Sequence, residues 1–230
     1  MSIKGFRKMS LVDYPDRICA VIFTGGCNFR CPFCQNPDLI NGLEEFPDID
    51  EKEILDYLKE KRDWLDGICI TGGEPTIYKG LVQLIEKIKS MGFLVKLDTN
   101  GSNPEMLKEL VGRKLLDYIA MDIKSSPERY SEASGCKVEM ENIRKSVEII
   151  RNSGIEYEFR TTVLPRLFSF EDAEKTGKWL KGSKRFFLQQ FRPDVTLDRS
   201  FEKEVPYSEE KLKKLADRMR PFFKEVDIRN

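Results

Sequence analysis

Short apolar runs alternate along the chain with stretches in which apolar residues recur every three or four positions. The short runs are rich in β-branched and aromatic residues, which is typical of strands. Strands are therefore predicted at six places: Ile18–Thr24, Gly67–Thr71, Phe93–Thr99, Tyr118–Ile123, Tyr157–Leu164 and Arg185–Phe191.

Helices are predicted between these strands from capping residues and from apolar spacing. Asp50, with Glu53 three residues on, can cap the start of one helix, and Asn103 followed by Pro104 can start another. Apolar residues that share one helical face predict three further helices, at Leu81–Ile88, Ile143–Ile150 and Leu212–Met219.

The alternation of strand and helix, about six times over, predicts right-handed βαβ crossovers and a parallel sheet, so the expected fold class is α/β. No low-complexity segment, repeat or linker interrupts the 230 residues. We expect a single domain with an N-terminal extension (1–16), a core (17–200) and a C-terminal helix and tail (201–230). In such folds ligands bind at the carboxyl ends of the strands, so unusual residues should follow them directly.

Composition narrows the possible partners and the available chemistry. Lys+Arg and Asp+Glu balance at 39 each, which gives no argument for binding nucleic acid or an anionic membrane. No signal-peptide core and no apolar run of about 18 residues occurs, so a cytoplasmic protein is expected. The chain has no histidine, which excludes Ser-His-Asp and Cys-His nucleophiles and histidine-containing zinc sites. Cysteine, carboxylate, lysine, arginine or a cofactor must carry the chemistry.

Three of the six cysteines, Cys27, Cys31 and Cys34, follow the first predicted strand. Clustered thiols in a reducing compartment favour a metal site over disulfides. Three thiolates in one tight loop are typical of an iron–sulfur cluster, and would leave one iron open to a ligand. A zinc site or a chance group of buried cysteines are the alternatives, although zinc normally needs a fourth ligand at a matching spacing. Cys19 and Cys69 lie within predicted strands and are expected in the core.

Glycine, charged and polar residues also stand on or directly after the other predicted strands. Gly72-Gly73-Glu74-Pro75 follows the second strand, the third ends in Asp98-Thr99-Asn100-Gly101, and the fourth ends in Asp122 and Lys124. The fifth strand carries Arg160 and Thr162, and the sixth runs into Gln189-Gln190-Phe191-Arg192-Pro193. Taken singly, each has a simpler interpretation: the glycine motifs form tight turns, and Asp122 with Lys124 forms an ion pair on one face of a strand. The combination is more specific than any of its members.

Together these motifs resemble the radical S-adenosylmethionine (SAM) superfamily. The Cys27-x3-Cys31-x2-Cys34 spacing, with Phe33 before the last cysteine, and the GGEP turn after the next strand carry the likeness. The order of "FTGGCNFRCPFCQNP", "TGGEPT", "LDTNG" and "MDIK" resembles the glycyl-radical-enzyme activating proteins. The N-terminal "GFRKMSLVDYPDRICAVIFT", without a second cysteine-rich insert, is most similar to the activating protein of anaerobic (class III) ribonucleoside-triphosphate reductase.

The resemblance implies a partial (β/α)6 TIM-like barrel, with a single parallel sheet and outer helices, and an oxidoreductase activity. It implies a [4Fe-4S] cluster on the three cysteines, whose open iron binds SAM, and an electron donor such as a flavodoxin or ferredoxin. Reductive cleavage of SAM then gives a 5′-deoxyadenosyl radical, which takes a hydrogen atom from a glycine of the partner reductase. Because the cofactor carries the radical, no catalytic side chain is predicted.

The resemblance also assigns roles to residues around the cofactor. The glycines of the GGEP turn and Glu74 would hold the methionine end of SAM, and Phe33 would lie near the adenine. Four residues match positions that surround the SAM carboxylate and a monovalent cation in the pyruvate formate-lyase activases: Asp98, Thr99, Asp122 and Lys124. Arg160 would be a further SAM contact. The pyruvate formate-lyase activases use a histidine near the sixth strand, for which Gln190 or Arg192 would have to substitute.

Two alternatives remain open at this point. One keeps the superfamily and changes the target to pyruvate formate-lyase, another glycyl-radical enzyme or a small molecule. The other is of a different class, a non-catalytic iron–sulfur electron carrier or a zinc-binding module that uses the same cysteines. The second alternative predicts no cleavage of SAM.

Overall fold

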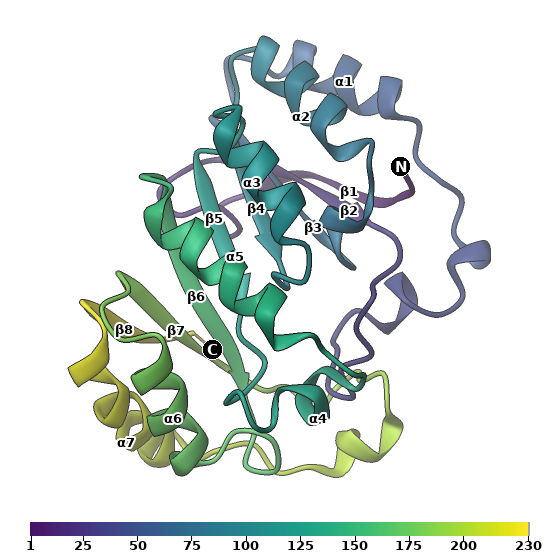
Figure 1. Cartoon of the computed structure of the whole chain (residues 1–230). Coiled ribbons are helices and arrows are strands. Elements are labelled where there is room, and N and C mark those ends of the chain that lie inside the picture. The colour runs from purple at the N-terminus through teal and green to yellow at the C-terminus, as the bar shows by residue number, and fades with distance from the viewer. Residues whose placement is uncertain (230) are drawn as a thin grey trace.

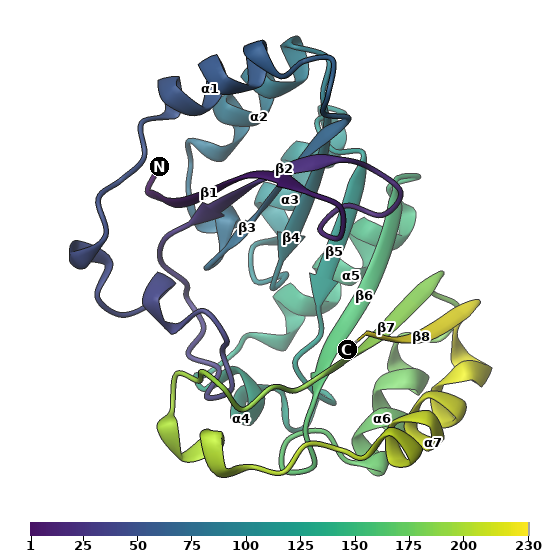
Figure 2. The same cartoon turned by 180° about the vertical axis from the view of Figure 1, so that it is seen from behind.

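The computed structural model describes residues 1–229, and its centre is a sheet of eight strands that keep their chain order. Within these residues β1 pairs antiparallel with β2, and each later pair of neighbours is parallel. The strands are β1 Ile3–Ser10, β2 Cys19–Thr24, β3 Gly67–Gly72, β4 Leu94–Thr99, β5 Tyr118–Asp122, β6 Glu156–Val163, β7 Arg185–Gln190 and β8 Glu225–Arg229. The sheet curves with β1 and β8 at its two edges, so it forms an open barrel (Figure 2).

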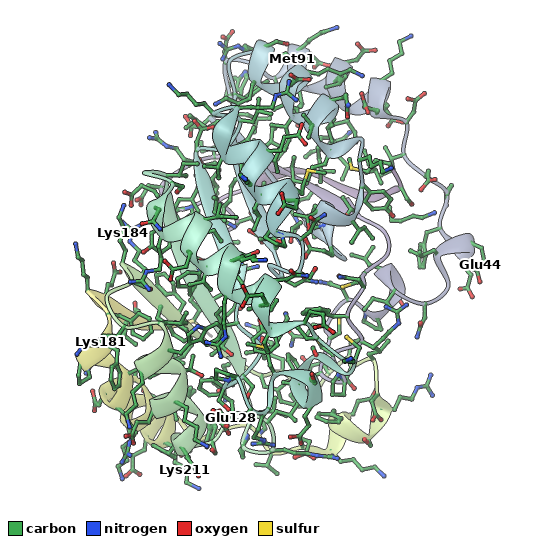
Figure 3. The ribbon with its side chains drawn as sticks, viewed as in Figure 1. Glu44, Met91, Glu128, Lys181, Lys184 and Lys211 are labelled. Atoms are coloured by element: carbon green, nitrogen blue, oxygen red, sulfur yellow. The ribbon has the colours of Figure 1, made fainter. Side chains whose placement is uncertain are left out.

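Seven α-helices of the described residues lie in the connections between strands; six of them cover the outer face of the sheet, and the short α4 lies beyond the carboxyl ends of the strands (Figure 1). Their bounds are α1 Glu51–Glu60, α2 Leu81–Ser90, α3 Pro104–Gly112, α4 Tyr130–Ser134, α5 Met140–Asn152, α6 Phe170–Trp179 and α7 Glu209–Met219. Charged side chains such as those of Glu44, Glu128 and Lys211 stand at the periphery (Figure 3). None of the helices described is long and apolar enough to cross a bilayer.

The predicted α/β class, a partial barrel with a parallel sheet and outer helices, is confirmed. The six predicted strands correspond to β2–β7, with ends that shift by at most one residue. Two strands were missed, β1 in the predicted N-terminal extension and β8 in the predicted tail. Both lie at an edge of the sheet, where one side of the strand has no neighbour and no long buried apolar run is needed. The same sheet thus takes strands from all three predicted segments of the chain.

The helix starts show how local sequence directs the connections. Asp50 accepts a hydrogen bond from the Lys52 amide at the start of α1, and Asn103 caps α3 ahead of Pro104, both as predicted. Helix α6 was missed, although Ser169 and Asp172 form a capping box there. Aspartate in place of the usual glutamate or glutamine at the third helical position made that signal weaker.

Two groups of buried side chains lie on the two faces of the sheet. The larger group fills the space between the sheet and the helices, and includes Ile70, Leu97 and Phe159. The smaller group lies on the opposite face, inside the open barrel, and is formed by Tyr14, Cys19, Val21, Cys69, Tyr118 and Ala120. Cys19 and Cys69 are both fully buried, which confirms the prediction that they belong to the core.

Candidate functional site

A cavity of about 200 Å³ opens at the carboxyl ends of the parallel strands. Its lining contains every residue to which the resemblance gave a role in binding the cluster or SAM: Cys27, Cys31, Phe33, Cys34, Gly72, Gly73, Glu74, Asp98, Thr99, Asp122, Lys124 and Arg160. It also contains residues to which no role was assigned: Phe29, Gln35, Asn36, Ile40, Thr71, Asn100, Thr162 and Gln189. The placement follows from topology, because the connections that leave parallel strands meet at one edge of the sheet.

The cysteine loop after β2 places its three thiols around this cavity. All are free cysteines, and Cys31 is the most deeply buried of them. Burial raises the pKa of Cys27 to about 11 and that of Cys31 to about 12. The neighbouring thiols raise the pKa of Cys31 further, and Lys124 opposes the shift. Without bound iron Cys27 and Cys31 therefore stay protonated at neutral pH, and both must lose a proton to bind iron as thiolates.

Two other loops hold the cysteine loop from the outside. The Arg30 amide donates to the Ser134 carbonyl at 2.8 Å, and a side chain at Gly135 would approach the Arg30 carbonyl oxygen to 1.9 Å. On the far side, the Asp198 amide donates to the Pro32 carbonyl at 3.0 Å. The connections after β5 and β7 thus fix the position of the thiols.

Cys136, for which no role was predicted, lies in the connection that follows α4. Its thiol is 3.7 Å from the carbonyl oxygen of Asn28 and 3.9 Å from the hydroxyl of Ser134. These contacts place it behind the cysteine loop, and it is absent from the residues that line the cavity. Cys136 therefore packs against the loop without facing the site.

The GGEP turn after β3 lies directly against the backbone of the cysteine loop. A methyl group at Gly73 would stand 1.8 Å from the Gly26 carbonyl oxygen, and the Glu74 amide donates to that same oxygen at 2.8 Å. Gly72 has a φ of +117°, and a methyl group there would lie 2.4 Å from the Thr24 amide nitrogen. Both glycines are required by the approach of two backbones, in addition to any contact with a ligand.

Glu74 joins the GGEP turn to the loop that follows β4. Its carboxylate accepts four hydrogen bonds: from the Thr76 amide at 3.1 Å, the Thr76 hydroxyl at 2.5 Å, the Thr99 hydroxyl at 2.7 Å and the Asn100 amide at 2.6 Å. The side chain is 1% exposed, and burial raises its pKa although these hydrogen bonds oppose the shift. Its contact with SAM stays a prediction, while its structural role is to hold two strand-end loops together.

Five charged side chains form a continuous chain of ion pairs across β4, β5 and β6, which we call the charge chain. Lys96 donates to one oxygen of Asp98, and Arg160 donates to the other at 3.0 Å. Arg160 also donates to Asp122 at 2.5 Å, and Lys124 donates to the second oxygen of Asp122 at 3.0 Å. Three cations and two carboxylates leave the charge chain with a net charge of +1.

Opposite charges inside the charge chain keep all of its members ionised. Burial alone would raise the pKa of Asp98 and Asp122, but the nearby cations outweigh it and hold both values below normal. Burial alone would lower the pKa of Lys96, but Asp98 outweighs it and the value is raised. The Asp122–Lys124 ion pair that was considered as a simpler interpretation does form, and both residues also line the cavity. The sequence did not single out Lys96.

Gln190 and Arg192, the two residues suggested in place of a histidine, both lie outside the lining of the cavity. Gln190 turns away from the cavity and donates to the Tyr207 carbonyl at 2.8 Å. Arg192 is exposed, and its carbonyl accepts a hydrogen bond from Gln35 at 3.2 Å. Gln189, one residue earlier on β7, lines the cavity instead. Strand alternation explains the difference, since neighbouring residues of a strand point to opposite faces.

The residues present suit an iron–sulfur cluster better than they suit a monovalent metal ion. Three free thiols line one cavity, as a cluster with three protein ligands requires. Among residues 1–229 no three Cys, Asp or Glu side chains are placed to bind one metal ion together, but the thiolates of a cluster bind different irons and need not converge. For a monovalent ion, every oxygen of Asp98 and Asp122 already accepts from a protein cation.

Comparison with known proteins gives the same assignment. The model of the radical SAM superfamily matches residues 21–180. A protein of Methanocaldococcus jannaschii, named provisionally as a glycyl-radical enzyme activating enzyme, is 34% identical over 99% of this chain and 95% of its own length. The pyruvate formate-lyase-activating enzyme of Clostridium pasteurianum is 28% identical over 85% of this chain and 82% of its own.

Solved structures agree on the fold. Streptococcus suis SuiB bound to S-adenosylmethionine superposes with a TM-score of 0.66 at 17% identity, over 87% of this chain. The chain spans 48% of the length of that structure. The fold, the three-cysteine loop and the family match agree, and they confirm the predicted superfamily together with its [4Fe-4S] cluster and SAM. The chain belongs to the radical SAM superfamily and, within it, is a relative of the glycyl-radical enzyme activating enzymes.

Proposed function

We propose that this chain is an activase that generates a glycyl radical on anaerobic (class III) ribonucleoside-triphosphate reductase. The observation that carries the activase assignment is the likeness to the Methanocaldococcus jannaschii protein, which extends over 99% of this chain. The narrower target is supported by the N-terminal segment "GFRKMSLVDYPDR", part of which forms β1 beside the first strand of the barrel. No membrane and no nucleic acid is needed as a partner, and the proposed location is the cytoplasm.

The protein would hold two cofactors and leave the radical chemistry to them. A [4Fe-4S] cluster would be bound by Cys27, Cys31 and Cys34 and would receive one electron from a flavodoxin or ferredoxin. That electron would serve the cleavage of SAM to methionine and a 5′-deoxyadenosyl radical. The radical would take a hydrogen atom from the partner's glycine. Cys27 and Cys31 must lose their protons as the cluster binds, because burial otherwise keeps both thiols protonated.

The side chains of the cavity would bind and shield SAM. The net positive charge of the charge chain suits the carboxylate of the methionine group, with Lys124 and Arg160 as its cationic members at the cavity. Phe29 and Phe33 are each 4% exposed and give the cavity an apolar side suited to the adenine. Transfer of a hydrogen atom needs no general base, so the absence of histidine is no obstacle.

A radical assay on the intact partners tests the target. The reduced, cluster-loaded protein is incubated with SAM and a class III reductase, and the glycyl radical is detected by electron paramagnetic resonance. The proposal expects a radical on the reductase at a yield that follows the formation of 5′-deoxyadenosine. The absence of a radical on the reductase, with SAM still cleaved, would refute the target while keeping the superfamily.

Pyruvate formate-lyase is the second candidate target, because its Clostridium pasteurianum activase is a relative over most of the chain. It is tested in the same assay in place of the reductase. The candidate of another class, a non-catalytic electron carrier or zinc module, predicts no 5′-deoxyadenosine at all. A matched pair of variants separates these cases: Cys31→Ala should abolish the product, whereas Cys69→Ala, at a cysteine that is also buried but lies outside the cavity, should retain it.

A further inference from the structure

The deepest member of the charge chain is Lys96, which lies beneath the cavity and does not line it. Lys96 is 3% exposed and lies on β4, a central strand of the sheet. The ammonium donates to Asp98, and its second neighbour is the Cys69 thiol at 3.6 Å. Burial raises the pKa of Cys69 well above normal, so this neighbour stays neutral. Asp98 is therefore the anion that balances Lys96.

Without Lys96, the site would contain two carboxylates against two cations. Arg160 lies between Asp98 and Asp122 and donates to one oxygen of each, and Lys124 serves the second oxygen of Asp122. The remaining oxygen of Asp98 would then have no cation beside it. A partly buried carboxylate oxygen without a partner is costly, and a small hard cation binds readily to such oxygens.

We propose that Lys96 is a positioning residue that occupies, with its own ammonium, the place of a monovalent metal ion beside Asp98. It makes the site positively charged without a metal and holds Asp98 and Arg160 in position for the carboxylate of SAM. SAM binding by this protein should consequently be independent of sodium and potassium. The inference concerns SAM binding, which the superfamily assignment carries, and it does not depend on which glycyl-radical enzyme is the target.

The test measures the SAM dissociation constant of the cluster-loaded protein by equilibrium dialysis, at one ionic strength, in sodium, potassium or choline chloride. The wild-type protein should bind SAM equally in all three salts. Lys96→Met, whose side chain ends one atom short of the ammonium position and carries no charge, should weaken SAM binding about tenfold in choline chloride, the loss of one charge-assisted hydrogen bond. Sodium or potassium should restore most of the loss, because the metal ion takes the vacated place.

Two controls keep the result interpretable. Lys89→Met removes a half-buried ammonium that pairs with Asp117 away from the cavity, and it should change neither affinity nor salt dependence. If Lys96→Met does not fold, the double variant Lys96→Met/Asp98→Asn removes the uncompensated charge as well. This variant should fold and should show no difference between the three salts.

A second readout does not use SAM or the cluster. In the cluster-free protein, the melting temperature of Lys96→Met should be higher in sodium chloride than in choline chloride, while that of the wild type should be the same in both. Three outcomes would overturn the proposal: a sodium or potassium requirement in the wild type, unchanged affinity of Lys96→Met in choline chloride, or weak binding by the folded variant in every salt.

Discussion

Replacing Gly73 by alanine should separate the two loops that build the cavity. The added methyl group would stand 1.8 Å from the Gly26 carbonyl oxygen and 3.3 Å from the Cys27 amide nitrogen. Ordinary contact begins at 3.4 Å, so the carbonyl would have to retreat by the difference, about 1.6 Å. Both obstacles are backbone atoms, which cannot rotate aside as the end of a side chain can.

Displacement of the Gly26 carbonyl should lower the stability of the protein, and it should lower the rate of SAM cleavage still more. It would break the hydrogen bond from the Glu74 amide to Gly26, at 2.8 Å, and displace Cys27, the next residue. Overpacking costs about 1–3 kcal/mol and the lost hydrogen bond about 1 kcal/mol, so the free energy of unfolding should fall by about 2–4 kcal/mol. A displacement of about 1 Å at reacting groups can lower a rate about 100-fold, which is the loss expected for SAM cleavage.

The assay compares iron bound per chain, SAM affinity and the rate of 5′-deoxyadenosine formation in anaerobically reconstituted protein. Gly112→Ala is the matched control: it ends α3, an added methyl group meets no atom within 4 Å, and its φ is not in the left-handed region. This control should leave the rate unchanged and stabilise the protein by up to about 1 kcal/mol. A Gly73→Ala protein with full iron content and a rate within about threefold of wild type would refute the reasoning.

Two further predictions concern buried carboxylates away from the cavity. Hydrogen bonds from Ser169 and other donors outweigh burial and lower the pKa of Asp172, so its stabilisation is present above the unfolded pKa of about 3.9 and is lost as the pH falls through the folded value. Asp172→Asn should therefore lower the free energy of unfolding, measured with urea at pH 7, by about 1–2 kcal/mol. The difference in stability between the variant and the wild type should shrink below about pH 4. Equal stability at pH 7 would contradict this. Arg229→Met should leave the carboxylate of Glu158, which is 0% exposed, with only the Tyr118 hydroxyl, and should cost about 2–3 kcal/mol by the same measurement. Adding Glu158→Gln should recover most of that loss, and no recovery would exclude an uncompensated charge as its cause.

The parts of the site that could be predicted are those encoded within one loop. The cysteine spacing, the GGEP turn and the polar residues after β4 and β5 are each contiguous in sequence, and parallel topology alone brings strand ends together. Gln190, one of the two residues suggested in place of a histidine, does not line the cavity, because its side chain points to the other face of β7 from Gln189. One residue along a strand reverses that direction, and the amphipathic pattern of "RFFLQQF" does not fix it.

The charge chain could not be predicted because it depends on contacts between strands. Asp122 on β5 lies in register with Arg160 on β6, whereas Asp98 on β4 lies in register with Ala120. Ala120 lies in register with Asp98 on one side and with Glu158 on the other, so Arg160, two residues further along β6, reaches Asp98 diagonally across β5, at 3.0 Å. Register and barrel curvature decide these distances, and neither can be derived from the alternation of one strand.

For Lys96, the sequence did contain a pattern from which an oppositely charged neighbour could have been predicted. In "FLVKLDT" Val95 and Leu97 face the helices, so Lys96 and Asp98 share the other face of β4. In an isolated sheet that face meets water, and a lysine there needs no explanation. In a curving parallel sheet the same face becomes the interior of the barrel, where an ammonium must have an anion. A charged residue in the middle of a central strand of such a barrel therefore predicts an oppositely charged neighbour on the inner face, and the salt dependence of Lys96→Met tests that rule directly.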